Sequence, residues 1–146
     1  MRFAERLARE KARAIRARKP GRLVLGADTI VVVRGQVLGK PGDRKDARRM
    51  LRLLSGRSHQ VTTAVCLAGP GFEDARSETT RVTMRRLSER EIRDYVASGE
   101  PMDKAGAYAI QGLASRFVSR IEGCYFNVVG LPVPLVYRML RAHRCL

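Results

Sequence analysis

The sequence predicts a mixed α/β domain whose sheet has a strongly antiparallel component and is flanked by helices. Two pairs of strand-like segments support this prediction. The first pair starts with the apolar, β-branched run 23–33 and turns through an Arg-Gly step at 34–35 into a short second strand. The second pair, 59–68 and 76–87, is separated by a Gly-Pro-Gly turn. Helical segments between and around these pairs complete the α/β pattern.

The first helix is expected over residues 1–18, where Pro20 and Gly21 end it. We expect it to pack on the sheet through one apolar face, although a basic arm for nucleic acid or a membrane is the alternative. The apolar face is predicted to hold Phe3, Leu7, Ala14 and Ile15.

Three further helices follow from their patterns. Residues 43–54 place apolar side chains at helical spacing after the candidate N-cap Asp43. Ser88 and Glu91 form a capping-box pattern that starts another helix, and Pro132 opens the last one. The remaining segments are predicted as a tight loop at 100–112, a strand at 117–121, and a loop and strand at 123–130.

Composition limits the classes of function. The 146 residues predict one domain spanning 1–146, with a core supported by 45% hydrophobic content. The chain has no apolar run long enough for a membrane span and no signal-peptide pattern, so we expect a cytoplasmic protein without a membrane partner. Three distant cysteines, Cys66, Cys124 and Cys145, have no spacing typical of zinc sites or disulfide frameworks.

The net charge of +15 would ordinarily favour nucleic acid as a partner. However, the basic residues are 24 arginines and 5 lysines scattered along the whole chain, without a basic block that contains aromatic residues. We therefore do not expect a nucleic-acid partner. The few lysines stand out, because Lys11, Lys40 and Lys104 persist where arginine is the usual choice.

Polar residues in two stretches predict a site. Asp28 lies within the apolar run, where a carboxylate needs a cation, a metal or several donors, and Lys40 follows the hairpin in a Gly-Lys-Pro step. The loop at 100–112 places Asp103, Lys104 and Gln111 among small residues. The alternatives are an aspartate that caps a loop, a solvated lysine, and an exposed Asp-Lys pair that contributes little stability. His59 at a strand start favours a structural role over a catalytic one.

Five ordered segments resemble the Maf family of nucleoside triphosphate pyrophosphatases: LGADTIVV, LGKP, RMLRLLSGRSHQV, GEPMDKAGAYAIQG and IEGCYFNVVGLP. The resemblance covers nearly the whole chain. It implies an elongated, twisted α/β sheet flanked by helices, akin to the inosine triphosphate pyrophosphatases. It also implies hydrolysis of nucleoside triphosphates to monophosphate and pyrophosphate with Mg²⁺ or Mn²⁺. The Asp-Thr pair at 28–29 is similar to the dTTP/UTP branch.

The resemblance also assigns roles to residues. Asp28 matches the family's catalytic aspartate, either a general base for water or a metal-linked carboxylate. Lys40 matches the lysine that faces the phosphates, and Lys104 is a further substrate-binding candidate. Thr29 and Gln111 match positions associated with base specificity. A homodimer is left open.

The chain departs from the family at its start. The family's first strand, its Ser-x-Ser-Pro-Arg-Arg-type triphosphate loop and the following acidic segment have no counterpart, since the sequence opens in the helix that precedes the aspartate strand. Two hypotheses therefore stand. The chain is either a dTTP/UTP-type pyrophosphatase or a shortened, catalytically impaired protein that binds nucleotides or nucleic acid through its basic surface.

Overall fold

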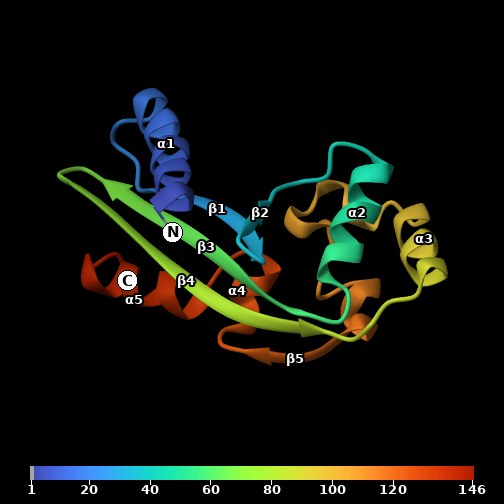
Figure 1. Ribbon diagram of the computed structural model, residues 1–146. Coiled ribbons are helices and arrows are strands. Elements are labelled where there is room, and N and C mark those ends of the chain that lie inside the picture. Colours follow the sequence, from blue (N-terminus) through green and yellow to red (C-terminus); the bar gives the residue numbers. More distant parts are fainter. Residues whose placement is uncertain (1) are drawn as a thin grey trace. The chain divides into compact units, whose positions relative to one another are not determined.

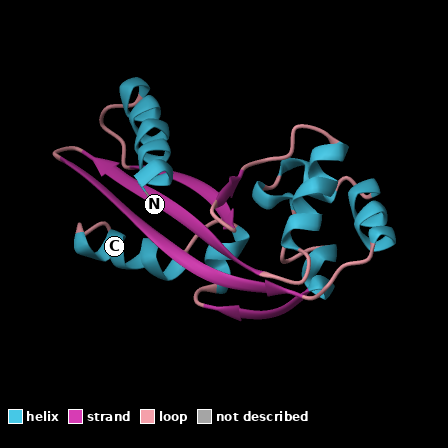
Figure 2. Ribbon diagram, viewed as in Figure 1, coloured by secondary structure: helices cyan, strands magenta, loops and turns pink. Residues whose placement is uncertain are grey.

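A computed structural model describes residues 2–146, and Figure 1 shows its helices and strands. The strands form one five-stranded sheet. The strand order is β2-β1-β3-β4-β5. The chain contains both helices and strands, as the sequence predicts for a mixed α/β fold (Figure 2). The elements are α1 Arg2–Arg18, β1 Val24–Val33, β2 Gln36–Leu38, α2 Arg44–Leu54, β3 Ser58–Gly69, β4 Phe72–Met84, α3 Glu89–Ala97, η1 Glu100–Asp103, η2 Ala105–Ala107, η3 Leu113–Phe117, β5 Val118–Glu122, α4 Tyr125–Val129 and α5 Val133–Ala142.

The contacts divide the chain into two compact units. The first unit contains the residues up to Thr29 together with Thr62–Thr79 and Cys124–Leu146. The second unit contains Ile30–Val61 and Thr80–Gly123. Strands β1, β3 and β4 each contribute residues to both units.

In the first unit, α1 packs against β1 through an alanine stripe. Ala4, Ala8 and Ala12 are fully buried. Gly26 of β1 allows this close approach, because a Cβ there would lie 2.5 Å from the Ala8 carbonyl oxygen and 2.9 Å from the Ala12 nitrogen. The predicted helix and its packing role are confirmed, but the predicted apolar face is wrong at Phe3, Ala14 and Ile15, which are exposed. Large side chains would hold the helix too far from the strand.

The opposite face of the same strands packs against α5. Val65 and Leu67 of β3 form a buried cluster with Leu135, Val136 and Met139 of the helix. Ala27 of β1 packs against this cluster. Since successive side chains of a strand alternate between faces, Gly26 and Ala27 separate the α1 side from the α5 side.

In the second unit, β1 and β2 form the predicted hairpin. The antiparallel register pairs Val31 with Leu38 and Val33 with Gln36. The two turn residues, Arg34 and Gly35, have φ values of 50° and 77°. Positive φ at both central positions matches the twist of a two-residue hairpin, and the Arg-Gly step is therefore the turn that the sequence predicts.

The predicted helix starts in the second unit are confirmed. Asp43 caps α2, since its side chain accepts a hydrogen bond from the Asp46 backbone nitrogen. Ser88 and Glu91 form a complete capping box at α3. These caps satisfy backbone donors that the first turn of a helix leaves open.

Two expectations about irregular segments need correction. The segment 123–130 holds no strand, because Tyr125–Val129 forms helix α4, which ends at Gly130 with a φ of 130°. The second long strand begins at Phe72, earlier than the predicted 76, since Gly71 alone supplies the positive φ of the turn. Within residues 2–146, no helix has the length and apolar character needed to cross a membrane.

Candidate functional site

Asp28 meets a lysine from α1. Lys11 Nζ lies 2.8 Å from Asp28 Oδ1 and donates a second hydrogen bond of 3.1 Å to the Ala27 carbonyl oxygen. The Asp28 side chain is 16% exposed, whereas that of Lys11 is 56% exposed. The close packing of α1 on Gly26 brings Lys11 to this position, one turn beyond Ala8 and directly before Ala12. The cation that a carboxylate in an apolar run requires is therefore Lys11.

The second carboxylate oxygen of Asp28 is open. No partner for Oδ2 occurs within the part of the chain that the structure describes. This arrangement fixes one oxygen and leaves the other for a water molecule, a metal ion or a ligand. A carboxylate held in this way has a defined direction for accepting a proton.

Thr29 faces the other side of β1. Its hydroxyl lies 2.9 Å from that of Thr63, and the Thr63 hydroxyl donates a bond of 3.2 Å to the Asn127 carbonyl oxygen in α4. Thr63 has one proton, which this bond uses, so Thr29 is the donor in the bond between the two hydroxyls. Asp28 and Thr29 are neighbours in sequence but serve opposite faces of the strand.

The second unit brings Lys40, Asp103 and Lys104 together. Lys104 Nζ lies 3.0 Å from Asp103 Oδ1. The Lys104 ammonium holds the pKa of Asp103 below its usual range, and the charge of Lys40 adds to this effect. Lys40 itself is exposed and forms no hydrogen bond or ion pair within residues 2–146. Two cations around one exposed carboxylate leave net positive charge for an anionic ligand.

Gly106 seats the lysine-bearing loop on β1. Its backbone nitrogen donates a hydrogen bond of 3.1 Å to the Gly39 carbonyl oxygen, next to Lys40. A Cβ at this position would lie 2.8 Å from Cγ2 of Val31 and would also meet an unfavourable φ of 73°. Only glycine fits both the contact and the backbone. The glycine of this stretch therefore allows the loop to approach β1 closely.

Gln111 lies on an exposed turn whose flanking residues are held firmly. The preceding residues Ala107–Ile110 are buried, and Gln111 itself is exposed. The Ala109 backbone nitrogen donates to the Tyr95 hydroxyl, and the Leu113 backbone nitrogen donates to Glu100 Oε1. The Gln111 side chain makes no hydrogen bond within the described chain.

His59 is a structural residue, as predicted. It is 2% exposed, and its Nε2 lies 2.6 Å from the Tyr108 hydroxyl. Burial lowers the pKa of His59 to about 4 and raises that of Tyr108. The neutral imidazole therefore ties β3 to the start of the segment that carries Gln111.

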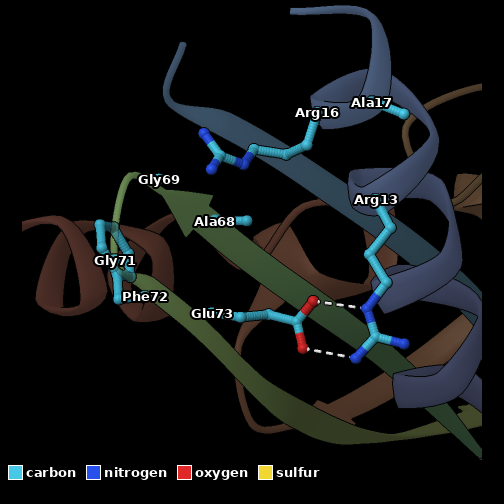
Figure 3. A pocket seen from close by; sticks show the side chains of 8 residues that line it. All are labelled: Arg13, Arg16, Ala17, Ala68, Gly69, Gly71, Phe72 and Glu73. Atoms are coloured by element: carbon cyan, nitrogen blue, oxygen red, sulfur yellow. Dashed lines mark hydrogen bonds and ion pairs between the residues drawn. The ribbon is translucent and has the colours of Figure 1, made fainter. Parts of the chain in front are cut away.

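A surface pocket of about 400 Å³ lies in the first unit between α1 and the tip of the β3–β4 hairpin (Figure 3). Its charged groups are already paired. Arg13 donates hydrogen bonds of 2.7 and 2.8 Å to the Glu73 carboxylate, and Arg16 donates to the carbonyl oxygens of Pro20 and Arg22. None of the predicted site residues lines the pocket, and we assign no ligand to it.

The described residues contain no group of three or more potential metal ligands among His, Cys, Asp and Glu. Asp28 alone offers an open carboxylate oxygen next to the apolar part of β1. Such a site fits Mg²⁺, which is usually held by one or two carboxylates together with substrate phosphates and water. It does not fit a metal ion held entirely by protein ligands.

The structure thus groups Lys40 with Lys104, places Thr29 in a hydroxyl network, and adds Lys11 as the partner of Asp28. Lys11 is a neighbour of Asp28 that the predicted site does not include. Its retention as one of 5 lysines among 29 basic residues was the only sequence feature that pointed to it. The spacing of 17 residues between Lys11 and Asp28 carried no information until α1 was placed on β1.

The chain is similar to known proteins along most of its length. A chain named dTTP/UTP pyrophosphatase from Koribacter versatilis is 61% identical over 139 residues, which cover 95% of this chain and 72% of that protein. A protein of the same name from Syntrophomonas wolfei is 60% identical over 94% of this chain and 74% of its own length. A third, from Symbiobacterium thermophilum, is 57% identical over 94% of this chain and 71% of its own length. Residues 1–143 match the family described as Maf-like protein. The chain therefore belongs to the Maf-like protein family.

Proposed function

We propose that this chain hydrolyses dTTP and UTP to the nucleoside monophosphate and pyrophosphate. The observation that carries the proposal is the 61% identity to a dTTP/UTP pyrophosphatase in a chain whose Asp28 is fixed by a lysine on one oxygen and open on the other. A soluble nucleotide pool is the expected source of the substrate, so the proposed location is the cytoplasm.

The reaction begins with attack of water on the α-phosphorus. A new P–O bond forms, the bond between the α-phosphorus and the bridging oxygen breaks, and pyrophosphate leaves. The water proton passes to Asp28 Oδ2, while Lys11 holds Oδ1 and fixes the direction of the carboxylate. Asp28 serves as the base in this scheme; its alternative role is to hold the metal ion that binds the phosphates.

Charge on the triphosphate has to be neutralised as pyrophosphate leaves. Lys40 and Lys104 supply two cations in one unit, and Asp103 holds the second of these in place. In its alternative role, Asp28 would hold a divalent cation, which would polarise the phosphoryl oxygens and neutralise part of their charge.

Base selection is assigned to Thr29 and Gln111. Because Thr29 donates its proton to Thr63, its hydroxyl can only accept a hydrogen bond from a ligand. Uracil and thymine carry an imide N–H at N3, where cytosine has an acceptor. An amide such as that of Gln111 can both donate and accept, which suits the mixed edge of these bases.

The test is pyrophosphate release from dTTP, UTP, CTP and GTP, each with and without Mg²⁺ or Mn²⁺. We expect metal-dependent cleavage that favours dTTP and UTP. Asp28→Asn should lower turnover by about 10²- to 10⁴-fold, the range for loss of a general base, without altering the fold. Asp94→Asn is the matched control, because Asp94 is an exposed aspartate whose ion pair with Arg90 is a long contact of 3.9 Å.

Two outcomes would count against the proposal. Retained turnover in Asp28→Asn would remove the role given to Asp28. A folded chain without turnover, whose nucleotide binding weakens steeply with salt and does not depend on Asp28, would favour the alternative of a basic binding protein.

A further inference from the structure

The turn that carries Gln111 is anchored on both sides by one pair of side chains. Tyr95, on α3, accepts a hydrogen bond of 3.1 Å from the Ala109 backbone nitrogen. Glu100, at the start of η1, accepts one of 3.0 Å from the Leu113 backbone nitrogen. The two anchors are themselves joined, since the Tyr95 hydroxyl donates a bond of 2.5 Å to Glu100 Oε2. Gln111 therefore lies midway between two residues that a single network fixes.

The tyrosine end of the network is buried, whereas Glu100 is partly buried. Tyr95 is 1% exposed, and its ring packs edge-on against Phe117 at 5.5 Å. The hydroxyl accepts from Ala109 and donates to Glu100, while each carboxylate oxygen of Glu100 has one donor. Burial and the neighbouring carboxylate both raise the pKa of Tyr95, so its hydroxyl keeps its proton. Hydrogen bonds are stronger in a low-dielectric environment than in water, so the buried Tyr95 hydroxyl is held firmly between its two partners.

Gly112 shows how closely the turn fits this pair. A Cβ at position 112 would collide with the carboxylate of Glu100. The turn is closed by its own backbone bond of 3.0 Å from the Gly112 nitrogen to the Ala109 carbonyl oxygen. The backbone next to Gln111 is therefore held by contact as well as by hydrogen bonds.

We propose that Tyr95 and Glu100 are positioning residues for base selection, because they fix the direction in which the Gln111 amide is presented to the nucleobase. This inference rests on the proposed function, in which Gln111 meets the base. Neither Tyr95 nor Glu100 needs to touch the ligand. Their effect reaches it through the backbone at Ala109 and Leu113.

The test measures base selectivity by binding, which needs no turnover. The readout is the ratio of the dissociation constants for CMP and UMP, obtained by calorimetry. We expect Tyr95→Phe to lower this ratio about five-fold, the loss that corresponds to one hydrogen bond. Gly112→Ala, which displaces the Glu100 carboxylate from the other side, should lower it in the same direction. Gln111→Ala should abolish the preference.

A double variant separates positioning from a general structural role. If Tyr95 acts through Gln111, Tyr95→Phe together with Gln111→Ala should be no less selective than Gln111→Ala alone. The matched control is Tyr108→Phe, which removes the hydroxyl of a second buried tyrosine that binds His59 instead of Glu100. We expect it to lower the melting temperature but to keep the selectivity ratio.

The inference fails if Tyr95→Phe and Gly112→Ala leave the ratio unchanged, if the double variant is less selective than Gln111→Ala, or if the unsubstituted chain shows no preference for UMP. Pyrophosphate release from UTP is measured separately. Binding that the variants make less selective, in a chain without turnover, would contradict the proposed function and support the positioning role. Turnover of UTP, with the same ratio of CMP to UMP dissociation constants in the variants as in the unsubstituted chain, would support the proposed function and contradict the positioning role.

Discussion

The contact between Gly26 and α1 makes a quantitative prediction for Gly26→Ala. The added Cβ would lie 2.5 Å from the Ala8 carbonyl oxygen and 2.9 Å from the Ala12 nitrogen. Ordinary C···O contacts are about 3.3–3.6 Å, so the helix has to move by roughly 1 Å. Both atoms belong to the backbone and cannot rotate away. The gap opened along the alanine stripe would remove about a quarter to a half of its dispersion attraction.

Overpacking of this kind costs about 1–3 kcal/mol in the free energy of unfolding. For a chain of this size we expect the melting temperature of Gly26→Ala to fall by about 3 to 12 °C. Differential scanning calorimetry measures this change. The matched control is Gly21→Ala, because a Cβ at position 21 has no heavy atom within 4 Å and the φ of Gly21 is not in the left-handed region.

The same displacement should reduce activity in the folded protein. Lys11 lies on α1 between the two residues that would be pushed away, and its bond to Asp28 is 2.8 Å long. Pyrophosphate release below the melting temperature should therefore fall in Gly26→Ala and not in Gly21→Ala. Equal melting temperatures for the two variants would refute the packing argument, because no rearrangement of side chains can relieve a collision with backbone atoms.

Two other predictions concern the titration of His59 and the role of Lys11. His59 has a pKa of about 4 when folded and about 6.5 when unfolded, so the unfolded chain binds the extra proton and stability falls as the pH drops from 6.5 to 4. The loss should approach about 3 kcal/mol, and His59→Gln should flatten the pH dependence of the unfolding free energy, measured with urea, across this window. Lys11→Met should lower pyrophosphate release by about 10-fold or more, the effect of losing a bond to a charged group, while Lys45→Met on the exposed start of α2 should not. Equal rates in the two lysine variants would show that Asp28 does not depend on its ion pair.

The sequence predicted most of the fold because local patterns decided the elements. The hairpin turn at Arg34 and Gly35, the caps at Asp43 and Ser88, and the alternating strand residues all act over a few positions. Helix α4 was missed for a corresponding reason. It is five residues long, and the apolar run in CYFNVVG has no period that separates a short helix from a strand.

The buried face of α1 was mispredicted because the rule that large apolar residues lie inside ignores distance between elements. Phe3 is 48% exposed although Ala8 is fully buried. Which stripe is buried depends on Gly26, which lies 18 residues beyond Ala8 in the sequence. Only the folded arrangement shows that this helix packs at a separation that alanine alone permits.

The candidate site could likewise be predicted only in part, because residue types are visible in the sequence whereas contacts between distant residues are not. Asp28, Lys40 and Lys104 could be singled out from the sequence, because a carboxylate in an apolar run and lysines in an arginine-rich chain are unusual. Gln111 was singled out by its place in a loop of small residues and by the family resemblance. Their partners could not. Nothing in the sequence indicates that Lys11 binds Asp28, that Lys104 binds Asp103, or that Tyr95 and Glu100 hold the turn around Gln111.

The Asp-Thr pair at 28–29 shows why chemistry cannot be assigned from adjacency alone. The pleat of β1 directs Asp28 to α1 and Thr29 to the hydroxyl of Thr63. The direction of the proton in that hydroxyl pair is then decided by a third residue, since Thr63 donates to the carbonyl oxygen of Asn127. Whether Thr29 offers a ligand a hydrogen-bond donor or an acceptor therefore depends on the backbone carbonyl of Asn127. That residue lies almost one hundred positions further along the chain, outside the Asp-Thr motif. A substitution at Thr63 should therefore act on base preference as strongly as one at Thr29, although only Thr29 belongs to the motif.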